Sequence, residues 1–255
     1  MPSGLTAEPV STTVERTERQ AGGRVFTEAW LRSPSGANPL SGDTVEALRA
    51  LLREQASRRD RHGLFIRAEG RAFCAGADVK EFARFDRAAF HAAMTAILGL
   101  YAEMIRFPQP IVSVVQADAL GGGAALAFCS DFVIAGRGAR FGLPEVHRGL
   151  AGGGYLMPRL LGKHRAAEMV LLGRSLDAAG ALRLGLIGEV CEAHELEPRA
   201  QAIAEELAAL APEGLAVAKV SLAGGLSSDL DSAMAAHIEA QANAFAARLA
   251  AAPNP

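Results

Sequence analysis

Cysteine is scarce in this sequence, and its positions are scattered. The chain of 255 residues has three cysteines, Cys74, Cys129 and Cys191. They form no CxxC pair and no spacing typical of a metal site, so we expect buried, unpaired thiols in a reducing compartment. The sequence therefore predicts neither a disulfide scaffold nor a bound metal ion.

An excess of charge of either sign is also missing. The 26 Lys and Arg residues against 28 Asp and Glu residues leave a formal net charge of −2. Proteins that bind nucleic acid or anionic lipid usually carry a basic field or a polybasic run. The sequence has neither feature, so we expect no nucleic-acid partner and no membrane partner.

Long hydrophobic runs are absent as well. No uninterrupted apolar segment approaches the ~18 residues of a membrane span. The first ten residues, MPSGLTAEPV, have no basic start followed by an apolar core, so a secretory signal is not expected. Glu8, Glu15 and Glu18 argue against a mitochondrial transit peptide. Together these absences favour a cytoplasmic protein.

What is present is the composition of a globular chain. Half of the residues are hydrophobic and 21% are charged, and the length suffices for a large buried core. Residues 1–11 are expected to form a tail. Residues 12–19 and 24–31 flank AGG and predict a β-hairpin. The apolar, β-branched segments 63–69 and 111–117 are typical of buried strands.

Helical patterns follow these strands. Residues 43–58 repeat apolar side chains at helical spacing, with Ser41 or Asp43 as the N-cap and Glu46 as the capping partner of Asp43. Residues 87–106 continue a helical pattern up to the prolines of FPQP.

Helices dominate the last third of the chain. From about residue 158 to residue 250 the sequence is mostly helical and rich in alanine. We therefore predict an α/β core over 12–195 and a helical C-terminal region over 196–255.

Two glycine-containing segments follow predicted strands. The first is FCAGADVKEF, Phe73 to Phe82, and the second is LGGGAALAF, which contains the triplet 121–123. Three glycines cost conformational entropy, and without side chains they let another atom approach the backbone closely. From the glycines alone, a tight turn packed against a neighbouring element is the simpler explanation of the triplet. The alternative is a pair of backbone N–H donors that converge from two strand ends and form an oxyanion hole.

These segments carry a family resemblance. FCAGADVKEF, LGGGAALAF and FGLPEVHRGL, in this order, resemble the crotonase superfamily, also called the enoyl-CoA hydratase/isomerase family, and GRSLDAAGALRLGLIGEV adds to the likeness. The resemblance covers residues 12–245. It implies a crotonase-like spiral of ββα repeats with a helical C-terminal trimerisation region, a homotrimer or dimer of trimers, and acyl-CoA thioester substrates.

The resemblance also implies which residues act. The two oxyanion-hole donors fall on the N–H groups of Ala77 and Gly122, and the catalytic carboxylate falls on Glu145. The residues that it implies for substrate or coenzyme A contact are Ala72, Phe73, Ala75, Gly76, Asp78, Gly121 and Gly153. It implies no metal and no cofactor of the protein's own, because coenzyme A arrives as part of the substrate.

One position departs from the family pattern. Hydratases of this family commonly use two glutamates, and the first of them corresponds here to Ala125, which cannot transfer a proton. A lone carboxylate at Glu145 suits a proton shift between two carbons better than the addition of water. We therefore expect isomerisation of an enoyl-CoA. Hydration with one glutamate, a C–C lyase or decarboxylase, and a non-catalytic acyl-CoA-binding protein remain alternatives.

The remaining polar residues are expected to have structural or accessory roles. Asp131 is expected to be a structural cap, and Asp118 a turn residue. His147 and Arg148 are exposed residues or contacts of a polar acyl tail. Tyr155 is within reach of a substrate.

Two further expectations concern the ends of the site. Asp78 is expected to cap the helix after the first donor, and Lys80 to lie near the surface or the path of coenzyme A. The chain ends in AAPNP, without the additional helix and basic tail that family members often have. This departure concerns how the pocket closes around coenzyme A.

Overall fold

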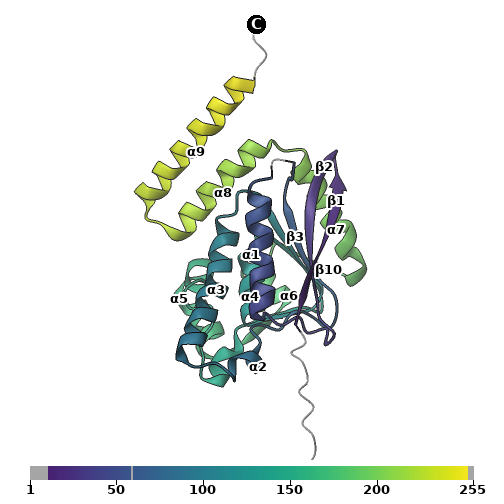
Figure 1. The fold of residues 1–255 in the computed structure, drawn as a ribbon, viewed down its shortest axis with the longest axis vertical. Helices are drawn as coiled ribbons and strands as arrows, with labels where there is room; N and C mark the ends of the chain where they lie inside the picture. Colours follow the sequence, from purple (N-terminus) through teal and green to yellow (C-terminus); the bar gives the residue numbers. More distant parts are fainter. Residues whose placement is uncertain (1–10, 59, 252–255) are drawn as a thin grey trace, which may run out of the picture.

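A computed structural model describes residues 11–58 and 60–251. The predicted tail 1–11 lies outside this part except for its last residue, and so do the final residues 252–255. Figure 1 shows a body of sheets and helices, from which the pair α8–α9 extends at the C-terminal end.

The elements alternate along the chain as the sequence predicts. The strands are β1 (Thr13–Ala21), β2 (Arg24–Arg32), β3 (Leu64–Ala68), β4 (Ala72–Cys74), β5 (Ile111–Val115), β6 (Asp118–Leu120), β7 (Phe132–Gly136), β8 (Arg140–Gly142), β9 (Ser175–Asp177) and β10 (Glu189–Cys191). The helices are α1 (Gly42–Ala56), α2 (Val79–Phe82), α3 (Arg87–Ile105), α4 (Gly122–Phe128), α5 (Met157–Leu171), α6 (Ala178–Arg183), α7 (Leu196–Ala208), α8 (Pro212–Ser227) and α9 (Leu230–Ala251), with the 3-10 helices η1 (Pro144–Arg148) and η2 (Ala193–Glu195).

Strands from β3 to β8 alternate between two sheets. One sheet has the order β1-β2-β3-β5-β7-β10, and the other has the order β4-β6-β8-β9. The strands β3, β5 and β7 pair in parallel in the first sheet, and their successors β4, β6 and β8 pair in parallel in the second. Each successive pair therefore adds one strand to each sheet before a helix follows, which confirms the crotonase-like spiral of ββα repeats.

The predicted hairpin opens the first sheet. β1 and β2 pair antiparallel over their full lengths, with Ala21 opposite Arg24. Gly22 and Gly23, which form the turn, have φ values of 51° and 73°. Both values lie in the left-handed region that glycine adopts without steric cost, so a two-residue turn is possible here.

The central strands are buried on both faces. Leu64 and Ile66 of β3 join the core between the sheets, whereas Phe65 between them joins a second core on the outer face. Helix α7 covers that outer face with Leu196 and Leu207, among other side chains. Because successive strand residues point to opposite faces, burial on both sides requires the continuous apolar runs that the sequence shows.

Helix α1 packs beside α3, and the predicted apolar face is correct. Its buried side chains include Val45, Leu48, Leu51 and Leu52. The N-cap is Ser41, whose side chain accepts from the N–H of Thr44 at 3.2 Å. The predicted capping pair of Asp43 and Glu46 is wrong, because the helix begins one residue earlier and Glu46 instead binds Arg53.

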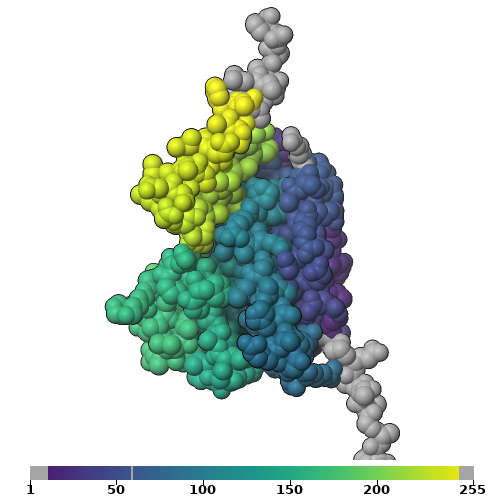
Figure 2. Space-filling view, turned by 60° about the vertical axis from the view of Figure 1, so that its left-hand side comes forward, coloured from purple at the N-terminus to yellow at the C-terminus, as the bar shows by residue number. Residues whose placement is uncertain are grey.

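The pair α8–α9 is attached through a buried ion pair. Lys219 of α8 binds both carboxylate oxygens of Asp131 at 2.8 Å, and Asp131 also accepts from the N–H of Ile111 at 2.7 Å. Asp131 is thus structural, as expected, but it secures β5 and α8 rather than capping a helix. Arg159 of α5 also donates to the carbonyl oxygen of Leu226 in α8 at 2.8 Å. In Figure 2 the pair forms a lobe on the body, coloured yellow to light green.

Candidate active site

The candidate site lies where three neighbouring strands end. β4, β6 and β8 are consecutive in the four-stranded sheet and run parallel, so their carboxyl ends meet at one edge. Ala77 follows the last residue of β4 by three positions, Gly122 follows β6 by two, and Glu145 follows β8 by three. The fold therefore brings together three residues that span 68 positions of the sequence, from Ala77 to Glu145.

The backbone after β4 turns sharply at Gly76. Its φ of 92° belongs to the left-handed side, and a Cβ there would lie 2.8 Å from the carbonyl oxygen of Leu120. Leu40 binds the chain on both sides of Ala77: it donates to Gly76 and accepts from Asp78. Within residues 11–58 and 60–251, the N–H of Ala77 has no protein acceptor.

The backbone after β6 presents a second free N–H. Gly121 has φ 55° and donates to the carbonyl of Gly142 at 2.8 Å, which fixes the loop to the end of β8. Gly122 begins α4, so its N–H precedes the first intrahelical hydrogen bond. No acceptor for this N–H lies among the described residues.

The two free N–H groups lie close to each other. A Cβ on Gly76 would be 3.2 Å from the nitrogen of Gly122, and a Cβ on Gly122 would be 3.6 Å from the nitrogen of Ala77. Side chains larger than hydrogen would thus fill the space between the two loops. The arrangement fits a single oxygen atom that accepts from both donors.

Glu145 is held beside these donors by the short helix η1. Leu143 precedes η1, Pro144 is its first residue, and Gly149, with φ 72°, ends it. The carboxylate is partly buried, and its Oε2 is buried without a hydrogen-bond partner in the described structure. Burial raises the pKa of the Glu145 carboxyl, against a smaller opposing effect of the Arg148 charge. A raised pKa makes the ionised carboxylate a stronger base.

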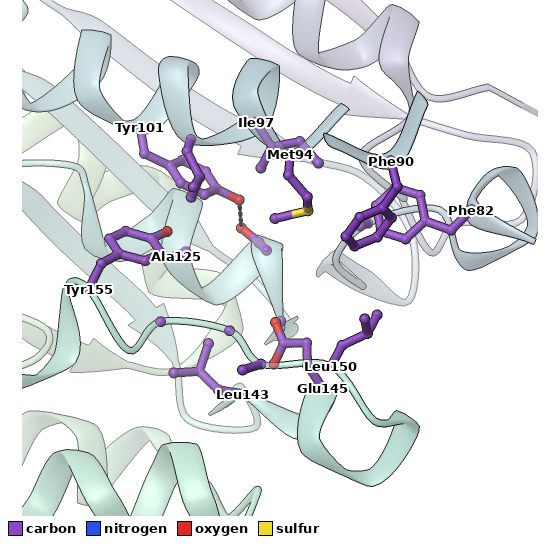
Figure 3. A pocket seen from close by; sticks show the side chains of 17 residues that line it. Phe82, Phe90, Met94, Ile97, Tyr101, Ala125, Leu143, Glu145, Leu150 and Tyr155 are labelled. Carbon is purple, nitrogen blue, oxygen red and sulfur yellow. Dashed lines mark hydrogen bonds between the residues drawn. The ribbon is translucent and has the colours of Figure 1, made fainter. Parts of the chain in front are cut away.

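An apolar cavity of about 250 Å³ joins the donors and the carboxylate. Its apolar walls come mainly from α2 and α3 and from the loop after η1. These side chains are Phe82, Phe90, Met94, Ile97, Leu98, Leu143 and Leu150. Figure 3 shows the Glu145 carboxylate directed into the space that they enclose. The cavity thus combines one carboxylate with walls suited to a hydrocarbon chain.

The comparison with known proteins decides the family. The pattern that describes the enoyl-CoA hydratase/isomerase family matches residues 26–250. The chain belongs to this family. Within the family, it is 36% identical over 218 residues to the mouse enoyl-CoA hydratase domain-containing protein 2, mitochondrial, covering 82% of this chain and 74% of the mouse protein.

One further relative of this crotonase-type enzyme and one solved structure are similar over most of the chain. The short-chain-enoyl-CoA hydratase of Clostridium acetobutylicum is 29% identical over 221 residues, covering 84% of each chain. A crystal structure of an enoyl-CoA hydratase from Bacillus anthracis superposes with a TM-score of 0.81 at 30% identity, covering 91% of this chain and 90% of that chain.

Only some of the residues predicted for the active site of this family member line the cavity. Those that line it are Ala77, Gly121, Gly122, Glu145 and Gly153. Those that do not are Ala72, Phe73, Ala75, Gly76 and Asp78. Gly76 shapes the first loop, and Asp78 caps α2 by accepting from the N–H of Lys80 at 2.9 Å, as expected.

The residues predicted to contact coenzyme A differ in accessibility in this family member. Ala72 and Phe73 are buried, and the backbone of Ala72 is already used: its N–H donates to Gly36, and its C=O accepts from Asn38 and Gln116. Ala75 is exposed. Contact of these residues with coenzyme A stays a prediction.

The position of the family's first glutamate is an alanine inside the cavity. Ala125 is 2% exposed and lines the wall. Tyr101 nearby was not among the residues predicted from the sequence, whereas Tyr155 was expected to lie within reach of a substrate. Both tyrosines of the chain line this cavity, and a low count of tyrosine could have drawn attention to them. Among the residues that line the cavity, these two carry the side-chain hydroxyls.

The other polar candidates lie away from the cavity in this enzyme. His147 and Arg148 are exposed and do not line it, so the contact with a polar acyl tail has no support in the geometry. Asp118 is the first residue of β6, where it pairs with Ala72, and not a turn residue as expected.

Proposed function

We propose that this enzyme isomerises the double bond of an enoyl-CoA through a thioester enolate. The observation that carries the proposal is the joint placement of two free N–H donors and a single carboxylate on one apolar cavity. A thioester oxygen between Ala77 and Gly122 would accept from both donors. The same donors would then hold the negative charge that develops when a neighbouring carbon loses a proton.

The proposed reaction moves one proton and leaves all other atoms in place. Glu145 removes a proton from C2 of a 3-enoyl-CoA, and the electron pair of that C–H bond delocalises onto the thioester oxygen. The protonated Glu145 then returns the proton to C4, and the double bond moves to between C2 and C3. The same carboxylate serves as base and acid, so the alanine at position 125 is compatible with this chemistry.

The walls of the cavity support an apolar acyl group. Besides Glu145, the side chains that line it carry no charge, and their polar atoms are the hydroxyls of Tyr101 and Tyr155. A charged acyl terminus would lose its hydration there without a partner. The proposed mechanism uses no cofactor of the protein's own, because backbone N–H groups stabilise the enolate.

Hydration is the second candidate. It is favoured by the relatives named as enoyl-CoA hydratases, including the one from Clostridium acetobutylicum. In this reaction Glu145 would activate a water molecule, and the hydroxyl of Tyr155 on the same cavity could help to hold it.

Isotope incorporation separates the two reactions. The protein is incubated in D₂O with a short 3-enoyl-CoA and, separately, with crotonyl-CoA, and the products are analysed by mass spectrometry. Isomerisation is expected to convert the 3-enoyl-CoA into the 2-enoyl-CoA, which chromatography separates, without adding oxygen. Deuterium enters at C4 to the extent that the proton on Glu145 exchanges with D₂O before it is returned. Addition of D₂O to crotonyl-CoA would show hydration. Recovery of both substrates unlabelled would contradict both candidates.

We also propose self-association, as the family resemblance implies, into a trimer or a dimer of trimers. The support is a row of exposed apolar side chains on α8 and α9. It comprises Leu222, Leu230, Met234, Ile238 and Phe245, each between 54% and 73% exposed. Surfaces of this kind usually meet a partner. Light scattering after size-exclusion chromatography tests it, with a monomer as the contradicting result.

A further inference from the structure

One hydrogen bond connects α3 to the second donor loop. The hydroxyl of Tyr101 donates to the carbonyl oxygen of Gly122 at 2.7 Å, and Figure 3 draws this bond at the cavity wall. Tyr101 is 2% exposed. The other tyrosine of the cavity, Tyr155, makes no hydrogen bond within the described residues. The two hydroxyls are therefore not equivalent.

The loop that receives this bond has no side-chain restraint of its own, while the carbonyl oxygen of Gly121 accepts from the N–H groups of Ala124 and Ala125 at the start of α4. Gly121 and Gly122 lack side chains, and α4 has no side-chain cap. Consecutive glycines are the residues with the greatest backbone freedom. The bond from Gly121 to Gly142 holds the loop on one side of the Gly122 N–H, and the bond from Tyr101 holds it on the other.

We propose that Tyr101 is a positioning residue for the oxyanion hole, because its hydroxyl holds Gly122 so that the N–H points at the substrate oxygen. This inference rests on the proposed function. The geometry is tight at this point: a Cβ on Gly122 would lie 2.9 Å from the Tyr101 hydroxyl and 3.6 Å from the nitrogen of Ala77. The hydroxyl and the first donor thus both lie next to Gly122, the residue that carries the second donor.

Burial keeps the hydroxyl in its donor form. The pKa of Tyr101 is raised well above its usual value, chiefly by removal from water. The hydroxyl therefore remains protonated across the working pH range and donates steadily to Gly122. Its proton is already donated to the carbonyl of Gly122, which distinguishes its proposed role from that of Glu145.

A purely structural role would have a different signature. A buried hydroxyl needs an acceptor, and Gly122 could serve only that need. Loss of the hydroxyl would then lower the melting temperature without changing the polarisation of the substrate carbonyl. A positioning role predicts a change in the polarisation of that carbonyl, because the second donor would no longer be aligned.

The test measures the infrared band of a thioester carbonyl labelled with ¹³C in bound butanoyl-CoA, which cannot isomerise. In the wild type the band is expected at a lower frequency than in free butanoyl-CoA. In Tyr101→Phe it should move back toward the free frequency, and kcat for the 3-enoyl-CoA should fall about tenfold, part of the loss expected for a whole donor. KM should change much less than kcat.

Ser113→Ala is the matched control. It removes another buried hydroxyl, which bonds Ser130 at 2.8 Å outside the cavity. Its melting temperature should fall as in Tyr101→Phe. Butanoyl-CoA bound to Ser113→Ala should nevertheless keep the carbonyl band that it has in the wild type. If Tyr101→Phe also keeps the wild-type band and kcat, the positioning role is overturned. A wild-type band at the free frequency would instead overturn the oxyanion hole and the proposed function with it.

A second pair of variants covers the case in which Tyr101→Phe folds poorly. Gly122→Ala would crowd the Tyr101 hydroxyl at 2.9 Å. Combining it with Tyr101→Phe removes the oxygen that is crowded. The same Cβ would also lie 3.6 Å from the nitrogen of Ala77, so the double variant is not expected to recover the kcat of Tyr101→Phe. Its loss should be smaller than the product of the two separate losses, and a loss equal to that product would contradict the proposal.

Discussion

The carboxylate of Glu145 occupies the space in which a side chain at residue 152 would lie. A Cβ built on Gly152 would be 2.1 Å from Oε1 of Glu145 and 2.4 Å from its carboxyl carbon. Two such atoms cannot remain at that distance. The glycine at this position is therefore part of what holds the carboxylate at the cavity.

Gly152→Ala is expected to displace Glu145 and to lower kcat at least about tenfold, because a small misplacement of a catalytic group is costly. The matched control is Gly154→Ala in the same loop, where an added Cβ meets no atom within 4 Å. Steady-state kinetics with a 3-enoyl-CoA measure both. Equal losses in the two variants would mean that the loop, and not the carboxylate, is responsible.

Glu145→Gln should remove turnover and keep binding. The amide has nearly the same shape but cannot accept the substrate proton, so we expect a loss of about 10²–10⁴ in kcat. Butanoyl-CoA should still bind, which isothermal titration calorimetry can measure. A variant that retains most of its activity would contradict the single-carboxylate mechanism.

Activity should depend on pH through the same group. Burial raises the pKa of Glu145, and only the ionised carboxylate acts as the base. The value of kcat/KM is therefore expected to fall as the pH is lowered, beginning at a higher pH than an ordinary glutamate would give. A pH profile measures this, with the residual activity of Glu145→Gln as the control that lacks the acidic limb.

Ala125→Glu should favour hydration. The side chain of residue 125 faces the cavity, and a second carboxylate there could hold a water molecule together with Glu145. We expect the rate of water addition to crotonyl-CoA to rise about tenfold or more. Ala125→Gln, with the same size and no carboxylate, should not show this gain. An equal gain in both variants would point to packing.

Much of the fold could be predicted because local patterns and tertiary environment agree. The hairpin at Gly22 and Gly23, the buried strands and the helices α1 and α3 all follow from turn residues and apolar periodicity. The capping error at Asp43 arose where two polar residues, Ser41 and Asp43, compete for one helix start. Only the actual start, at Gly42, decides which of them accepts the hydrogen bond.

The candidate site was predictable in its backbone more than in its side chains. The segments around Ala77 and Gly122 are rich in glycine and alanine and follow predicted strands, so they stand out in the sequence alone. Tyr101 is different, because no sequence motif around it in its helical segment indicates a role. Its hydrogen bond joins it to Gly122, 21 positions later in the chain. No periodicity predicts which face of α3 turns toward α4.

The sequence by itself determined the chemistry that this protein can perform. It placed a carboxylate at Glu145, an alanine at residue 125 and bare backbone at two strand ends, because residue types alone decide which groups can donate, accept or transfer a proton. Tertiary structure decided how these groups meet. Parallel pairing of β4, β6 and β8 brings their ends to one edge, and packing around Glu145 excludes enough water to raise its pKa. Distance and solvent exclusion depend on residues far apart in the chain, so only the folded protein determines them.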